Sequence, residues 1–157
     1  MPTNQADPSR ILPDLQCALL CEDVRIEMNQ NFILIGVIRN LAVRQISAPI
    51  GRLLLFSRWT AGFGEFIQTA KLLAPDKTTV LCTCEVQFGL RTGDDINSVI
   101  SVFQNIQFPA VGVYYIEVAV DQVVKIRFPL PVSEIPQQNQ PQAPNAAPDS
   151  DGSKDDE

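Results

Sequence analysis

Histidine is absent from the 157 residues of this chain. It is the side chain that titrates near neutral pH without help from its surroundings, and it commonly serves as a general base or as a zinc ligand. Its absence excludes Ser-His and Cys-His nucleophile pairs and the usual zinc enzymes. We therefore expect a protein that is not an enzyme and that binds neither a metal nor a cofactor.

Long apolar runs are also missing. No stretch approaches the ~20 consecutive apolar residues that a membrane helix requires, and the opening sequence M-P-T-N-Q-A-D-P-S-R has no hydrophobic signal core. Hydrophobic residues make up 45% of the chain and charged residues 19%, a balance typical of a soluble globular protein. We expect a cytoplasmic protein with no membrane partner.

Positive charge is scarce. The formal net charge is −6, and most of it lies in the C-terminal segment. Residues 134–157 contain six acidic residues and one basic residue, whereas residues 1–133 contain twelve acidic and eleven basic residues. A nearly neutral body lacks the clustered Lys and Arg that attract a phosphate backbone. We therefore expect no nucleic-acid partner.

Composition divides the chain into three parts. Residues 1–12 are polar, and we predict a flexible N-terminal arm there. Residues 134–157 are rich in proline, glutamine and acids, with too few large apolar residues to offset the entropy lost on ordering. We predict a disordered tail over that range and a single domain over residues 13–133, a length that supports one hydrophobic core.

Alternating apolar residues predict an all-β domain. Along residues 112–120, Tyr114 and Ile116 belong to one face of an extended chain, and Asp121-Gln122 separates this run from a second one. Two such runs joined by two residues form an antiparallel hairpin. The rest of the domain gives eight or nine strands in all, which favours a two-sheet antiparallel β-sandwich; an eight-stranded barrel is the second choice.

Residues 96–108 fit two patterns. A helical stripe would contain Ile96, Val99, Ile100 and Phe103. The density of β-branched residues instead favours an extended strand, one face of which would contain Ile100, Val102, Ile106 and Phe108. We predict a strand and keep a helical turn at its start as the alternative.

Four cysteines leave two interpretations open. Cys17 and Cys21 form a C-x-x-x-C spacing, and Cys82 and Cys84 form C-x-C. If their strands were neighbours, four thiolates could hold a metal ion, but closed zinc sites normally use C-x-x-C on a tight turn. The spacing favours free thiols that pack as small hydrophobic residues in a reducing cytosol.

Five residues are weak candidates for binding. Asp23 and Arg25 share a face of a strand, so they form either a structural ion pair or a ligand clamp. Asp94 and Asp95, like Asp23, are acids expected at turns or strand ends. Such acids are typical of solvent-exposed turns, but two of them facing one cleft would suit a glycosidase-like carboxylate pair. Trp59 could form an exposed aromatic contact, although a lone tryptophan at a strand end more often packs into the core.

Three further residues are expected to have structural roles. They are Gly36, Gly112 and Tyr114. Gly112 provides backbone freedom at the start of a strand, and the ring of Tyr114 is expected to be buried with its hydroxyl bonded near the sheet edge.

Several segments together carry a family resemblance. They are L-Q-C-A-L-L-C-E-D-V-R, F-I-L-I-G-V-I, F-P-A-V-G-V-Y-Y-I-E-V-A-V-D and F-P-L-P-V. Over most of residues 15–132 the chain resembles a bacterial family of uncharacterised small proteins known only as a domain of unknown function. The resemblance implies an immunoglobulin-like or C2-like β-sandwich and no assigned reaction. Where the family's final turn looks like Asp-Gly, this chain has Asp121-Gln122.

The leading functional prediction is a non-enzymatic binding module. It would contact another macromolecule through strand edges or loops, and we expect that partner to be a protein. Two alternatives stay open: a hydrolase or lyase that uses paired carboxylates, and a structural subunit of a phage-like or envelope assembly. The sequence leaves the oligomeric state open.

Overall fold

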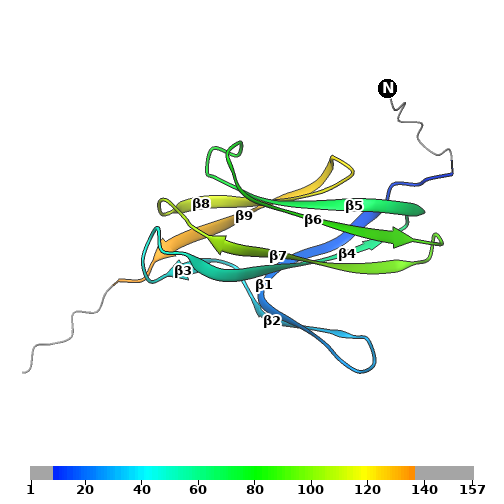
Figure 1. Ribbon diagram of the computed structural model, residues 1–157, viewed down its shortest axis with the longest axis horizontal. Helices are drawn as coiled ribbons and strands as arrows, with labels where there is room; N and C mark the ends of the chain where they lie inside the picture. The colour runs from blue at the N-terminus through cyan, green and yellow to red at the C-terminus, as the bar shows by residue number, and fades with distance from the viewer. Residues whose placement is uncertain (1–8, 137–157) are drawn as a thin grey trace, which may run out of the picture.

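The computed structural model describes residues 9–136, which form nine β-strands in two sheets, one of them curled into a half-barrel (Figure 1). The predicted all-β, two-sheet fold is therefore confirmed. The described residues include no helix that could cross a membrane. Residues 1–8 and 137–157, which hold most of the predicted arm and tail, lie outside the described residues, so those two assignments stay predictions.

The strands follow one another without a helix between them. In chain order they are β1 (Asp14–Ile26), β2 (Phe32–Val37), β3 (Leu41–Val43), β4 (Ile50–Thr60), β5 (Gly64–Leu73), β6 (Val80–Leu90), β7 (Ile96–Ile106), β8 (Gly112–Val120) and β9 (Val123–Glu134). The first sheet has the order β2-β1-β4-β7 and the second β3-β9-β8-β5-β6.

One strand departs from the predicted antiparallel arrangement. The three-residue strand β3 pairs in parallel with β9, whereas every other strand pair is antiparallel. The chain passes from β2 in the first sheet directly to β3 in the second, where β3 runs in the same direction as β9. Such a short strand carries little signal of its pairing direction in its sequence.

The ambiguous segment is a strand. β7 pairs with β4 from Ile96 to Ile106, which excludes the helical alternative over these residues. The buried residues Val99, Ser101 and Phe103 face the core, whereas Ile100 and Val102 belong to the other face. After Asn105, whose φ is +52°, the inward side chains are those of Ile106 and Phe108. The predicted strand is therefore confirmed, although only Ile106 and Phe108 of the four residues that indicated it face the main core.

A polar cluster joins the two sheets inside the core. The Nε2 of Gln68 on β5 donates to Ser101 Oγ at 2.9 Å, and its Oε1 accepts from Trp59 Nε1 at 2.6 Å and lies 2.5 Å from Ser57 Oγ. All four residues are fully buried. Because a buried polar group without a partner costs roughly 1–3 kcal/mol, this mutual satisfaction is what allows glutamine inside an apolar core.

Tyr114 and Gly112 have the expected structural roles. The Tyr114 ring is buried, its hydroxyl donates to the carbonyl oxygen of Ala110 at 2.8 Å, and its centroid lies 4.7 Å from that of Phe108. A tyrosine bonded to the backbone a few residues upstream is a recurrent corner of β-sandwiches. Gly112 begins β8 with a φ of +157°, which residues bearing a Cβ adopt rarely.

Candidate functional site

The second half of β1 forms a two-stranded arm with β2. Strand β1 pairs with β4 only as far as Cys21, and from Cys21 to Ile26 it pairs with β2. We call residues 22–37 the hairpin arm. Figure 1 shows this arm projecting from the body, with its loop at the free end. Beyond Cys21, β1 therefore pairs with β2 alone among the described strands.

The arm folds back over the outer face of the first sheet. Its Phe32 ring lies 5.2 Å from that of Phe56 on β4. Beneath the arm, Cys21, Leu54 and Phe56 form a second buried cluster that is separate from the main core. Strand β4 is consequently buried on both faces, since Leu53 and Leu55 point into the main core.

Gly36 bends β2 where the arm begins. Its φ is +63°, a left-handed conformation that favours glycine, and a Cβ at this position would come within 2.6 Å of Glu22 Oε2. The structural role predicted for Gly36 therefore has two physical reasons. The register of β1 with β2 is the same on both sides of the bend, with Cys21 opposite Val37 and Asp23 opposite Ile35.

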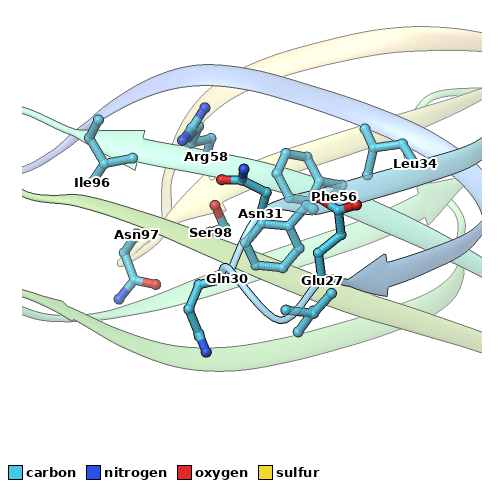
Figure 2. A pocket seen from close by; sticks show the side chains of 11 residues that line it. Glu27, Gln30, Asn31, Leu34, Phe56, Arg58, Ile96, Asn97 and Ser98 are labelled. Atoms are coloured by element: carbon cyan, nitrogen blue, oxygen red, sulfur yellow. The ribbon is translucent and has the colours of Figure 1, made fainter.

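A groove lies between the arm and the start of β7 (Figure 2). Its volume is about 780 Å³, within the range of ligand sites. Its lining residues are Ile26, Glu27, Gln30, Asn31, Phe32, Leu34, Phe56, Arg58, Ile96, Asn97 and Ser98. Amide side chains, a serine hydroxyl and two charged groups thus surround the aromatic rings of Phe32 and Phe56. We call this feature the hairpin groove.

Arg58 is the cation of the hairpin groove. It lies on the outer face of the first sheet, opposite Cys17 on one side and Ser98 on the other. Within residues 9–136 its guanidinium forms no hydrogen bond or ion pair, whereas those of Arg25 and Arg52 both contact Asp23. The N–H groups of the Arg58 guanidinium are therefore free to donate to an anionic or carbonyl oxygen of a ligand in the groove.

The free edge of β2 is the second feature of the arm. β2 is the last strand of its sheet, and its sequence F-I-L-I-G-V contains neither a charge nor a proline. On its outward face, Ile33 is 42% exposed and Val37 is 55% exposed. Natural proteins usually protect such edges with charged residues, proline or a covering segment.

The predicted pair of Asp23 and Arg25 is present. Asp23 Oδ2 lies 3.5 Å from Arg25 Nε, and its Oδ1 lies 3.1 Å from Arg52 Nη2. A carboxylate held between two guanidinium groups agrees with the structural ion pair and leaves little of Asp23 to clamp a ligand.

Asp94 and Asp95 belong to the turn before β7. The Asp95 carboxylate accepts the N–H of Arg91 at 2.7 Å, which fixes the turn, and Asp94 is exposed. Asp23 contacts Arg52 near one end of β4, and the carbonyl oxygen of Asp95 contacts Thr60 at the other. Arg52 and Thr60 are eight positions apart along β4, or about 26 Å, so Asp23 cannot form a carboxylate pair with either turn acid.

Trp59 is not a surface residue. Its exposed fraction is 0%, its ring stacks on Phe88 at 5.4 Å, and its Nε1 is bonded to Gln68. The prediction of an exposed aromatic contact is therefore wrong for Trp59, and the core-packing interpretation is correct. The position belongs to the inward face of β4, where an indole has both apolar contacts and a partner for its N–H.

The cysteines lie in separate places. Cys17 and Cys21 are in the cluster beneath the arm, whereas Cys82 and Cys84 on β6 pack against the main core. Their strands belong to different sheets, so the condition for a four-thiolate site is not met. Burial, with a smaller contribution from Asp23, raises the pKa of the Cys21 thiol, as expected for a thiol that packs as an apolar side chain.

Sequence reasoning missed both features of the arm. The signal for its fold-back was the run L-L-L-F in β4, since a strand that is apolar on both faces is covered on both. The signal for the free edge was a six-residue strand without charge or proline.

Comparison with known proteins places the chain in a family. The family model described as "Family of unknown function (DUF6941)" matches residues 16–133. A search of the curated proteins found no match. The matched range contains almost all of the described strands, including the whole hairpin arm. The chain therefore belongs to the family of unknown function DUF6941.

Proposed function

We propose that the protein is a non-enzymatic interaction module that binds a partner polypeptide by strand addition at β2. The observation that carries this proposal is the unprotected free edge of β2. A strand added there would bond to the free backbone groups and cover Ile33 and Val37. Burying the exposed part of each of these two side chains contributes roughly 1 kcal/mol.

The other strands at the sheet margins are less suited to strand addition. β3 has only three residues, and short edge strands resist pairing. β6 and β7 lie beside each other at the opposite margin, where Asn97 Nδ2 donates to the carbonyl oxygen of Gly89 at 2.9 Å. Most of β9 also has an unpaired outer edge, because β3 covers only Val132, Ser133 and Glu134. That stretch of β9 contains Lys125, Arg127, Pro129 and Pro131, and charges and prolines oppose strand addition. Among the described terminal strands of the two sheets, β2 is therefore the longest whose edge is uncovered.

Photo-crosslinking tests the proposal. A photoreactive phenylalanine analogue at Ile33 should give adducts of higher mass when the protein is irradiated in extracts of the cells that produce it. The same analogue at Val113, also 42% exposed but on the interior strand β8, is the matched control and should give none. Equal crosslinking at the two positions, or none at Ile33, contradicts strand addition.

The alternatives from other classes have less support. A carboxylate-based hydrolase or lyase would need two acids in one cleft, and the acids considered for it are held at opposite ends of β4. Asp23→Ala and Asp95→Ala variants that lose turnover on a broad substrate panel would revive it. A structural subunit of an assembly would use the same β2 edge and differs only in the number of copies joined.

The hairpin groove supports a second candidate function, binding of a small anionic ligand. The specific observation is the unpaired guanidinium of Arg58 among amide side chains. Titration with acetate and with phosphate, followed by amide NMR shifts, should give saturable changes at Phe32 and Ser98. These changes should vanish in Arg58→Gln and persist in the surface control Arg44→Gln. Unchanged shifts in Arg58→Gln would exclude the site.

A further inference from the structure

We propose that the strand added at β2 is the β2 of a second copy of this chain, in an antiparallel pair centred on Ile35. This inference rests on the proposed function, since it names the partner for the same edge. The two first sheets would join into one continuous sheet around a twofold axis. The argument depends on how the edge matches itself in shape and in charge.

The apolar pattern of the edge is self-complementary. In an antiparallel pair centred on Ile35, the two Ile35 residues face each other and Ile33 of each copy faces Val37 of the other. Directly opposed residues share a face of the sheet. The exposed aliphatic side chains of both strands therefore meet in one stripe, flanked on β1 by Asp23 and Arg25, which lie opposite Ile35 and Ile33.

The charges at the ends of the edge match in the same register. Arg39 of one copy would lie opposite Asn31 of the other, and Glu27 is next to Asn31, because its N–H donates to the Asn31 carbonyl oxygen at 2.8 Å. In the part of the chain that the structure describes, neither the Glu27 carboxylate nor Arg39 has an ionic partner. Two strand spacings, about 9.6 Å, separate the two backbones, a span that these long side chains bridge.

The bend at Gly36 does not prevent this pairing. β1 already pairs with β2 on both sides of Gly36 in a single register, and a second copy of β2 has the same bend at the same place. The twofold arrangement also uses the β2 edges of both copies at once. The product is thus a closed dimer that leaves no free β2 to extend a fibre.

Analytical ultracentrifugation of the full chain tests the inference. The 17.3-kDa chain should sediment as a dimer, with a Kd of roughly 1–100 μM for an interface of this small size. Ile33→Lys should shift it to the monomer, and Val113→Lys, the matched control, should not. Unfolding curves of both variants establish that each is folded.

Charge reversal tests the register. Glu27→Arg and Arg39→Glu should each weaken the dimer by about tenfold, since each places like charges at both ends of the pair. An equimolar mixture of the two variants should restore wild-type affinity, because every Arg then faces a Glu. A structural role for either residue within its own chain would not produce this recovery.

Three results would overturn the inference. They are a wild-type chain that stays monomeric, a dimer that tolerates Ile33→Lys, and a charge-reversed mixture that fails to recover. If crosslinks from Ile33 reach only other proteins, self-pairing fails and strand addition stands. If Ile33 gives no crosslinks at all, both proposals fail.

Discussion

The molecule contains two long hairpins, β1–β2 and β8–β9, which differ in how they are joined to neighbouring strands. The β8–β9 hairpin has strands on both sides, since β5 pairs with β8 from Tyr115 to Val120 and β3 pairs with the last three residues of β9. Its turn is fastened to β5, since Asp121 Oδ1 accepts the N–H of Ile67 at 2.9 Å and Arg10 pairs with the same carboxylate. In the β1–β2 arm, by contrast, no other strand of residues 9–136 pairs with the outer edge of β2. The difference separates a hairpin that stabilises the domain from one that is available for contact.

The largest expected difference between the hairpins concerns their apolar cores. Leu130→Ala in β9 removes a fully buried side chain and should lower the free energy of unfolding by about 2–5 kcal/mol. Leu34→Ala in β2 affects a half-buried residue and should cost about half as much. Urea unfolding of both variants measures this. Equal costs would show that the arm is as integral to the fold as β9.

The polar cluster that joins β5 to β4 and β7 gives the next effect. Gln68→Ala should lower the free energy of unfolding by about 2–4 kcal/mol, because it leaves Trp59 Nε1 and Ser101 Oγ without their Gln68 partner. Ser57 keeps its hydrogen bond to the Val99 carbonyl oxygen. Gln87→Ala, at an exposed position of β6, is the control and should change it by less than about 0.5 kcal/mol. A neutral Gln68→Ala would mean that water replaces the amide.

The turns of the two hairpins allow a matched comparison of backbone strain. Gln122 has a φ of +71° in the β8–β9 turn, and Gln30 has a φ of +69° in the arm loop. Gln122→Gly should raise the free energy of unfolding by about 0.5–1 kcal/mol, since glycine relieves the left-handed conformation. Gln30→Gly should raise it less, because the arm opens more easily than the body. Equal gains in thermal unfolding would contradict independent opening.

The smallest effect concerns pH and a third turn. Hydrogen bonds from the Thr79 hydroxyl, and then from the N–H groups of Thr79 and Thr78, lower the pKa of Asp76 from 3.8 to about 2. The stabilisation is complete above the unfolded pKa and is lost as the pH falls through the folded one. Asp76→Asn should therefore be less stable than wild type at neutral pH and equal to it near pH 2. Asn29→Ala, in the arm loop, should show no such pH dependence.

Alternation of apolar residues was sufficient to predict the strands and the two-sheet fold. It worked well for β8, where Tyr114, Ile116 and Val118 all face the core. The twin positive φ angles of Asp121 and Gln122 form a two-residue type I′ turn, which the spacing of the hairpin indicated and the residue types did not.

The arm could not be predicted by the same means. Strand β1 changes its partner from β4 to β2 near Cys21, and nothing local in the thirteen residues of this strand marks that point. The exposed edge depends on which strands meet across long distances in the chain, and so does the burial of Trp59. The candidate site was missed for this reason, because the residues around Arg58 come together only after the arm folds back.

The reactivity of the buried Cys21 thiol reports the opening of the hairpin arm. Because burial raises the pKa of this thiol, an alkylating reagent meets an unreactive, covered group as long as the arm is closed. Modification must then wait for the arm to lift away from β4. The alkylation rate of Cys21 therefore measures how often the arm opens, and a molecule bound along β2 would lower that rate.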